Sequence, residues 1–317
     1  MKSAVIFLFL TAAIWGLSYS MQAEAMNTMK PLAFVFLRYL IGAAALLPMI
    51  IYSGKKFYKS VIAGGIICGT MARELAKKGV KVALLDLFVE NAQRIADEIN
   101  ANGGEAIAVK ANVLDRASLE EARDAVIARF GHIDILVNGA GGNKPQATIS
   151  KDLDFFHLDL DAFKWVFDLN VTGAVLTTMV FGELLAKQGH GNVINIASMS
   201  SYHPLTNTVA YCGAKAAVAN FTEWMATHFN QNYSNNIRVN AIAPGFLLTN
   251  QNRYLLTNED GSATDRGQRV LAKTPMGRYG EPEEMVGPVI FLCSEAASFV
   301  NGTVIPVDGG FSSYWGV

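Results

Sequence analysis

The fold and the chemistry of this chain are indicated most strongly by residues 195–217, N-I-A-S-M-S-S-Y-H-P-L-T-N-T-V-A-Y-C-G-A-K-A-A. The stretch starts inside an apolar run, residues 193–197, that is typical of a buried strand. A polar turn follows, and then an Ala-rich run with helical spacing. Tyr211 and Lys215 are four residues apart, so on a helix they lie on one face, one turn apart. Ser198 ends the strand, where its hydroxyl could hold a substrate carbonyl oxygen.

A lysine ammonium beside a phenol favours the phenolate and lowers the tyrosine pKa from its usual value of about 10. This would make Tyr211 a proton donor and acceptor near neutral pH. Alone, a Tyr-x-x-x-Lys pair is a weak signal, because a packed tyrosine next to a solvated lysine is the commoner explanation. The pair gains weight from Ser198 and from the motifs that accompany it in order.

The composition limits the classes of function. With 317 residues the chain can form one large domain or two. Its formal net charge of −1 gives no electrostatic case for nucleic acid or an acidic membrane surface as a partner. Cys68, Cys212 and Cys293 are scattered, which suits a reducing compartment and argues against a disulfide framework. The five histidines form no ligand-spaced cluster, so we predict no metal site.

The first part of the chain differs in hydropathy from the rest. Up to residue 54 the charged side chains are Lys2, Glu24, Lys30 and Arg38. Residues 3–23 and 31–53 are each long and apolar enough to cross a bilayer. Basic residues at both outer ends favour cytoplasmic termini. A signal peptide and a buried soluble hairpin are less favoured alternatives, the first because a second apolar span follows.

Trp15-Gly16 in the first span, with Pro31 and Arg38 opening the second, resemble the start of EamA-type drug/metabolite transporters. This resemblance covers about the first fifth of the chain. Such transporters need many more helices, so a transport function is disfavoured. We predict two transmembrane helices in residues 1–57, which tether a cytoplasmic catalytic domain, residues 58–317, to the cytoplasmic membrane.

Strand-like and helix-like segments alternate after residue 58, which predicts an α/β fold with a doubly wound parallel sheet covered on both faces. The expected strands are residues 61–65, 81–86, 106–110, 133–137, 193–197, 237–243 and 303–307. The expected helices are residues 67–78, 90–102, 118–129, 161–187, 210–233 and 282–295.

The first of these units has the form of a dinucleotide-binding half. Gly64, Gly65 and Gly69 lie at the turn between strand and helix, and the second strand ends in Asp86. A carboxylate there bonds ribose hydroxyls and repels a 2′-phosphate, and Leu87 stands where an NADP enzyme often has a basic residue. Both features favour NAD. Taken in isolation, a turn or helix cap is about as good an explanation of Asp86.

Six short motifs then follow in a specific order and spacing. They are Asn138-Gly139-Ala140-Gly141, Leu169-Asn170, Ser198, Tyr211-Cys212-Gly213-Ala214-Lys215, Arg238-Val239-Asn240 with Pro244-Gly245, and Asp308-Gly309-Gly310. Together they resemble the short-chain dehydrogenase/reductase family, from about residue 70 to the end. The resemblance implies a Rossmann-like fold, NAD as cofactor, a small-molecule substrate and a homo-oligomer.

The resemblance also implies roles for single residues. Tyr211 is the acid/base, and Lys215 lowers its pKa while holding the nicotinamide ribose. Ser198 polarises the carbonyl, and Asn170 supports a proton-relay water. The implied cofactor-binding residues are Gly64, Gly65, Gly69, Asp86, Asn112, Val113, Asn138, Ala140, Gly141, Tyr211, Lys215, Pro244, Gly245 and Thr249. Asn112 is a mild departure, because the family usually has Asp there.

Residues 141–145, 249–253 and 309–317 resemble the sugar-acid branch that contains fructuronate reductase, also called D-mannonate oxidoreductase. A polyhydroxy acid needs many hydrogen bonds and one cation for its carboxylate. The side chains that would supply them, beside Ser198, are Asn143, Gln251, Asn252 and Arg253, although solvated polar residues explain any one of these better. The implied reaction interconverts D-mannonate and D-fructuronate. The alternatives are a membrane-tethered, catalytically impaired NAD-binding module and a dehydrogenase for another polyol or sugar.

The family's Thr-Gly-x-x-x-Gly-x-Gly loop is altered at its start, where Val61 and Ile62 replace Thr-Gly. A β-branched Ile62 cannot cheaply adopt a positive φ, and Val61 cannot make the side-chain bond expected of threonine. We therefore predict that NAD binding is weakened by about 1–3 kcal/mol. The chain as a whole reads as a fusion of two unrelated genes joined near Gly69.

Overall fold

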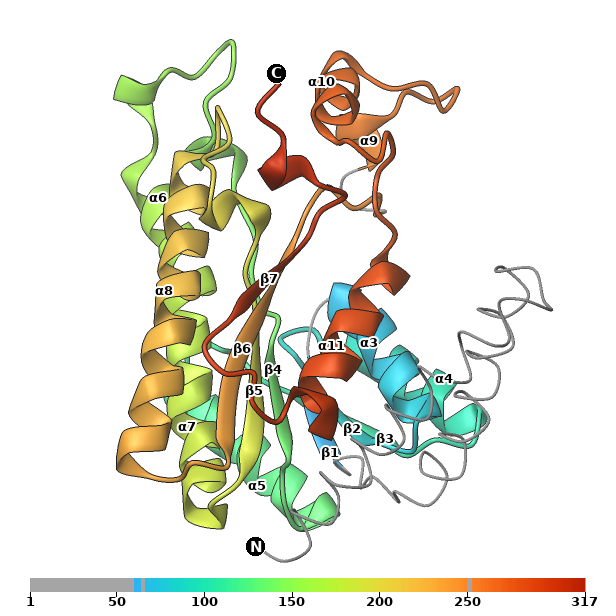
Figure 1. Cartoon of the computed structure of the whole chain (residues 1–317), viewed down its shortest axis with the longest axis vertical. Helices are drawn as coiled ribbons and strands as arrows, with labels where there is room; N and C mark the ends of the chain where they lie inside the picture. The colour runs from blue at the N-terminus through green and yellow to red at the C-terminus, as the bar shows by residue number, and fades with distance from the viewer. Residues whose placement is uncertain (1–59, 64–65, 250–252, 317) are drawn as a thin grey trace, which may run out of the picture. The chain divides into compact units, whose positions relative to one another are not determined.

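A computed structural model describes residues 60–63, 66–249 and 253–316 of the chain. The predicted transmembrane helices, together with Gly64, Gly65, Gln251 and Asn252, lie outside the described residues. In the described part, seven parallel strands form one sheet in the order β3-β2-β1-β4-β5-β6-β7 (Figure 1). The predicted Rossmann-like α/β fold is confirmed.

All seven predicted strands are found, with ends shifted by a few residues at most. They are β1 Ser60–Ala63, β2 Lys81–Asp86, β3 Ala106–Lys110, β4 Ile135–Asn138, β5 Gly191–Ile196, β6 Ile237–Pro244 and β7 Val304–Val307. Every residue of β4, β5 and β6 is buried. Parallel strands covered on both faces need such continuous apolar runs, which is why the sequence pattern located them.

Helices cover both faces of the sheet. The described α-helices are α3 Ile66–Lys77, α4 Val89–Ala101, α5 Arg116–Phe130, α6 Leu160–Phe167, α7 Gly173–Gln188, α8 Val209–Asn232, α9 Arg253–Leu256, α10 Asp265–Lys273 and α11 Val286–Cys293. One core layer joins α3, α4 and α11 to the sheet, and a second joins α5, α7 and α8 to its other face (Figure 1). The sheet is therefore packed between two apolar layers, one on each face.

The order of the strands fixes where a ligand can bind. The chain runs from β1 outward to β3, returns to β4 beside β1, and then continues outward to β7. The direction of strand order therefore reverses between β1 and β4. In open α/β sheets the crevice at the carboxyl ends of such strands is the usual place for a nucleotide.

The long predicted helix 161–187 is interrupted. Residues Asp168–Thr172 form a π-helical turn between α6 and α7. A π turn inserts an extra residue and rotates the side chains that follow it, and such turns are frequent at functional sites. The sequence pattern did not show it, because both flanking helices keep the same apolar character. The expected helix 282–295 also divides, into a 3₁₀ turn at Pro282–Met285 and α11.

The predicted backbone strain at Ile62 is wrong. Ile62 lies inside β1, in register with Ala83 of β2 and Leu136 of β4. In the part of the chain that the structure describes, every residue with a positive φ is a glycine. Ile62 is therefore an ordinary strand residue without the backbone strain that we expected of it.

Within the described residues, one helical run, Leu160–Gln188, is long and apolar enough to be a candidate membrane span. Half of its most apolar window is buried inside the protein. This is what the central helix of an α/β domain looks like, because α7 packs on β4 and β5.

Candidate active site

The first candidate catalytic group is Tyr211, on the first turn of α8. It lies half-buried against a small hydrophobic cluster formed by Ala147, Ala162, Val166 and Ala210. Ser198, buried at the end of β5, hydrogen-bonds the Tyr211 side chain. The Ser198 hydroxyl also accepts a hydrogen bond from the backbone N–H of Ser200 at 3.2 Å, which fixes its orientation. The two predicted hydroxyl groups are therefore brought together.

Lys215 lies one turn further along α8 and is buried. Its Nζ donates to the carbonyl oxygen of Ile196 at 2.7 Å and lies 5.7 Å from the centre of the Tyr211 ring. Burial lowers the pKa of Lys215 to about 8, because the charged form loses its hydration. The lysine is thus tied to the strand that carries Ser198.

The prediction that Lys215 lowers the pKa of Tyr211 is wrong for this geometry. Burial raises the pKa of the Tyr211 phenol above its ordinary value, and the hydrogen bond with Ser198 opposes that effect without overcoming it. The physical reason is that loss of hydration penalises the phenolate, while the ammonium is directed at Ile196. Tyr211 is therefore set up as a proton donor.

Asn170 sits in the π turn and is buried, with 1% of its surface exposed. Its Nδ2 donates to the carbonyls of Gly142 at 2.7 Å and Val166 at 2.8 Å, and its Oδ1 accepts from the N–H of Gly142 at 3.3 Å. An added Cβ at Gly141 would stand 2.6 Å from Asn170 Oδ1 and 3.3 Å from Lys215 Nζ. Asn170 and Lys215 therefore converge on the turn that follows β4, and only glycine fits between them.

A buried polar network links the strands and helices that carry the catalytic candidates. Asn138 Nδ2 donates to Thr178 Oγ1 at 2.9 Å and to Asn195 Oδ1 at 2.8 Å. Asn195 Nδ2 in turn donates to Thr222 Oγ1 at 2.9 Å. These bonds tie β4 and β5 to α7 and α8, so they fix the strand ends that carry the catalytic candidates. The sequence does not indicate these roles of Thr178, Asn195 and Thr222, because a polar residue in an apolar run gives no sign of its partner.

The adenosine end of the predicted cofactor site is described in part. Asp86 ends β2, and its Oδ1 accepts the N–H of Phe88 at 2.9 Å, so the carboxylate also caps a turn. Asn112 likewise caps its own turn through Leu114 N–H at 3.0 Å. Val113 faces Gly173, where an added Cβ would stand 2.9 Å from Val113 Cγ2.

A cavity of about 30 Å³ opens there, lined by Val113, Asn138, Gly139, Ala140 and Gly173 among others. Gly69 lies in α3, against Ile95 of α4. This small space, where the strand order reverses, is lined by three residues predicted to bind the cofactor: Val113, Asn138 and Ala140.

Apart from Ser198, the described residues predicted to bind the substrate, Asn143 and Arg253, have no described contact with each other. Asn143 is exposed, and its Nδ2 donates to Thr148 Oγ1 at 2.9 Å. Arg253 is exposed at the start of α9, where its N–H donates to the carbonyl of Thr249 at 2.9 Å. Gln251 and Asn252 lie outside the described residues. The described contacts therefore tie neither Asn143 nor Arg253 to Tyr211 or Ser198.

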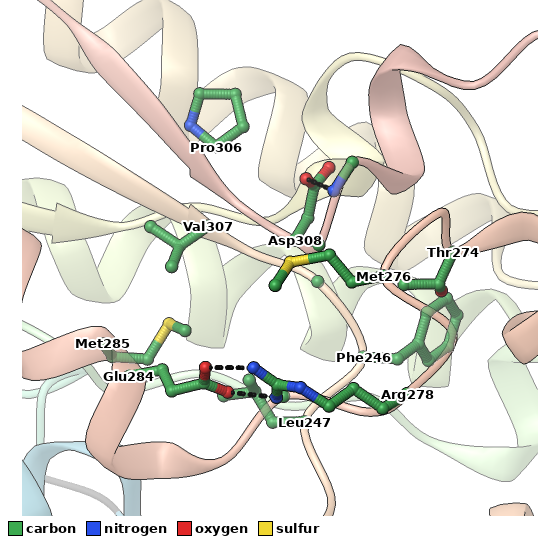
Figure 2. Close-up of a pocket in the computed structure, with 14 residues that line it drawn as sticks. Phe246, Leu247, Thr274, Met276, Arg278, Glu284, Met285, Pro306, Val307 and Asp308 are labelled. Atoms are coloured by element: carbon green, nitrogen blue, oxygen red, sulfur yellow. Dashed lines mark hydrogen bonds and ion pairs between the residues drawn. The ribbon is translucent and has the colours of Figure 1, made fainter. Parts of the chain in front are cut away.

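A larger cavity, about 280 Å³, lies beside the carboxyl ends of β6 and β7 (Figure 2). Arg278 and Glu284 both line it, and Figure 2 shows them paired through two contacts, which are 2.7 and 2.6 Å long. Arg278 holds the pKa of Glu284 at about 2. The Pro-Gly turn reaches this cavity through Gly245, whereas Ser198, Tyr211, Lys215 and Asn170 do not line it. We therefore place the chemistry at the hydroxyl pair rather than in the larger space.

The C-terminal segment, part of the stretch 309–317 that resembles the sugar-acid branch, packs on two loops at the edge of the sheet. The Phe311 ring lies 5.3 Å from that of Phe246, and the Trp315 ring lies 5.3 Å from that of His203. Phe246 and His203 belong to the loops that follow β6 and β5. Figure 1 shows this segment, in dark red, at the carboxyl edge of the sheet. It therefore covers the loops that follow Ser198 and Gly245.

Comparison with known families agrees with this geometry. The profile of the family described as Enoyl-(Acyl carrier protein) reductase matches residues 63–312. The profile of the EamA-like transporter family matches residues 2–75. The two matches overlap at residues 63–75, which include the junction predicted near Gly69.

Individual relatives point the same way. An uncharacterized oxidoreductase of Haemophilus influenzae is 49% identical over 267 residues, which are 80% of this chain and 92% of that protein. The 2-dehydro-3-deoxy-D-gluconate 5-dehydrogenase of Escherichia coli is 34% identical, over 76% of this chain and 89% of that protein. A structure provisionally described as a D-mannonate oxidoreductase of Haemophilus influenzae, with bound NAD, is 48% identical with a TM-score of 0.76. The matched part covers 82% of this chain and 96% of the chain in that structure.

Proposed function

This chain belongs to the short-chain dehydrogenase/reductase family and is an NAD-dependent oxidoreductase of CH–OH groups, and we propose that it interconverts D-mannonate and D-fructuronate. The observation that carries the catalytic part of the proposal is the convergence of four side chains at the ends of β4 and β5. Ser198 hydrogen-bonds Tyr211, while Lys215 and Asn170 meet at Gly141.

The described residues fit a nicotinamide dinucleotide. Asp86 presents a carboxylate at the end of β2, where it would bond the adenosine ribose and disfavour a 2′-phosphate. The adenine would lie beside Val113 and Ala140, which line a small cavity where the strand order reverses. Lys215 would hold the nicotinamide ribose, and Thr249 the carboxamide. When bound, NAD supplies the hydride acceptor for the alcohol, and NADH the donor for the ketone.

The protein groups move the proton. In the reduction of a ketone, the Ser198 hydroxyl donates a hydrogen bond to the carbonyl oxygen and holds it beside Tyr211. The Tyr211 phenol gives its proton to that oxygen as the charge develops on it. In the oxidation of an alcohol the same phenolate takes the hydroxyl proton. Because burial raises its pKa, Tyr211 is in the protonated form that ketone reduction needs near neutral pH.

The substrate assignment rests on three supports. The stretches 141–145, 249–253 and 309–317 resemble the sugar-acid branch of the family, and a solved relative carries the name D-mannonate oxidoreductase. Asn143 and Arg253 offer an amide and a cation near the carboxyl edge of the sheet, as a polyhydroxy acid needs. A polyol or sugar dehydrogenase and an impaired NAD-binding module are the alternatives.

A substrate panel tests this proposal. The purified full chain, in detergent, is mixed with NADH and with D-fructuronate, other keto-acids or neutral ketoses, and NADH oxidation is followed. We expect the highest kcat/KM with D-fructuronate. A higher value with a neutral ketose would favour a polyol dehydrogenase, and NADH binding without turnover of any substrate would favour the impaired module.

We also propose that the catalytic domain forms a homo-oligomer in the cytoplasm and that the N-terminal segment tethers it to the membrane. The first rests on the family alone and the second on the EamA-like match. Size-exclusion chromatography of the chain from Lys56 onward tests the oligomer, and elution as a monomer would contradict it.

A further inference from the structure

Lys144 is a cation that the proposed chemistry has not yet used. It follows Asn143 and precedes the 3₁₀ turn Pro145–Ala147, in the segment that leaves the end of β4. Its side chain is half-buried, and its Nζ lies 4.2 Å from the centre of the Trp165 ring, a cation–π contact. The contact favours this position of the ammonium, whereas a freely solvated lysine adopts many conformations.

No carboxylate neutralises this ammonium within the described residues. The ion pairs there include four other lysines, namely Lys77, Lys81, Lys164 and Lys187. Lys144 takes part in none of these pairs. A cation that is partly removed from water and has only an aromatic ring as partner gains free energy when an anion approaches it.

The position of Lys144 relates it to the catalytic groups. Two residues earlier, Gly142 exchanges hydrogen bonds with the side chain of Asn170. Trp165 precedes Asn170 by five residues, about one and a half helical turns. Trp165 and Tyr211 pack against the same hydrophobic cluster, that of Ala147, Ala162, Val166 and Ala210. The Lys144 ammonium therefore lies over Trp165, which packs on the cluster that Tyr211 also contacts, and no described contact joins it to the Tyr211 side chain.

We propose that the Lys144 ammonium binds the carboxylate of the substrate and that Trp165 is a positioning residue for it. This assignment rests on the proposed function. In D-mannonate and D-fructuronate three hydroxylated carbons separate the carboxylate from the reacting carbon. A cation that lies over the Trp165 ring, beside the cluster that Tyr211 also contacts, suits a carboxylate at that separation, whereas one in contact with Tyr211 would not.

A pair of ketoses that differ in charge tests the assignment. D-fructose carries a CH₂OH group where D-fructuronate carries the carboxylate. We expect Lys144→Met to lower kcat/KM for D-fructuronate by about 10- to 100-fold, the scale of a charge-assisted hydrogen bond, mainly through KM. The value for D-fructose, or its inhibition constant against D-fructuronate, should stay within about twofold of the unmodified chain. Lys144→Arg should recover part of the loss, and Trp165→Leu should reproduce part of it.

Lys164→Met is the matched control. Lys164 is on the same helix as Trp165 but is exposed and paired with Asp161 at 3.3 Å. An equal loss for both ketoses, or an equal loss in the control, would overturn the assignment of Lys144. So would a charge-selective loss in Arg253→Met with none in Lys144→Met. If the unmodified chain uses no keto-acid at all, the proposed function fails, and the assignment fails with it.

Discussion

At the scale of single residues, the direction of the pKa shift of Tyr211 determines the pH dependence. Its phenol stays protonated because burial raises its pKa. Ketone reduction needs the phenol and alcohol oxidation needs the phenolate, so kcat/KM for oxidation should rise from about pH 6 to about pH 9, while that for reduction stays level. Steady-state rates in both directions test this. A plateau of the oxidation rate at or below neutral pH would show a lowered pKa instead.

Lys215 allows a separate test by stability. Its folded pKa of about 8 is below the unfolded value of about 10.4, so the unfolded chain binds more protons between these two pH values. The free energy of unfolding should therefore rise with pH across that window, by up to about 3 kcal/mol, relative to Lys215→Met. Thermal unfolding of both proteins in detergent, at several pH values, measures the difference. A difference that does not change with pH would contradict the buried ammonium.

The identities of the catalytic candidates could be predicted from the sequence, whereas their electrostatics could not. The four-residue spacing places Tyr211 and Lys215 on one helix face, and the ordered family motifs supply their roles and that of Ser198. The pKa of Tyr211 was predicted in the wrong direction, since it depends on desolvation and on the bond from Lys215 to Ile196. Neither can be read from spacing, because both depend on how α8 packs on β5.

At the scale of elements, the strands and the main helices could be predicted because each buries a long apolar run. The π turn at Asp168–Thr172 could not, since one extra residue in a helix leaves the composition unchanged. Short elements such as α9 and α10 were also missed, because α10 is mostly polar and exposed. Asn143 and Arg253 belong to such irregular segments, so their place relative to Tyr211 depends on loop geometry that no periodicity encodes.

The altered first turn of the nucleotide site is tested by substitution in β1. Since Ile62 is an unstrained strand residue, the expected weakening of NADH binding reduces to a lost polar contact, about 1 kcal/mol. The double change Val61→Thr, Ile62→Gly should tighten NADH binding about fivefold in a fluorescence titration. An unchanged dissociation constant would show that the turn is not impaired.

At the scale of the whole molecule, two unrelated family matches meet in one chain, at residues 2–75 and 63–312. If residues 1–57 form two transmembrane helices, as the apolar spans predict, the catalytic domain stays with the membrane. We expect the full chain in the membrane pellet after a wash at high salt and in the supernatant only after detergent. Full recovery in the soluble fraction without detergent would contradict the anchor.

We expect the whole chain, with its N-terminal segment and altered turn, to be an active reductase that works through Tyr211. The most direct measurement compares the full chain with Tyr211→Phe for NADH affinity and for NADH-dependent reduction of D-fructuronate. We predict that the change leaves the NADH dissociation constant within about twofold and lowers kcat by about 100- to 10,000-fold. A Phe variant that keeps most of its kcat would contradict the role of Tyr211, because the proton would then come from another group.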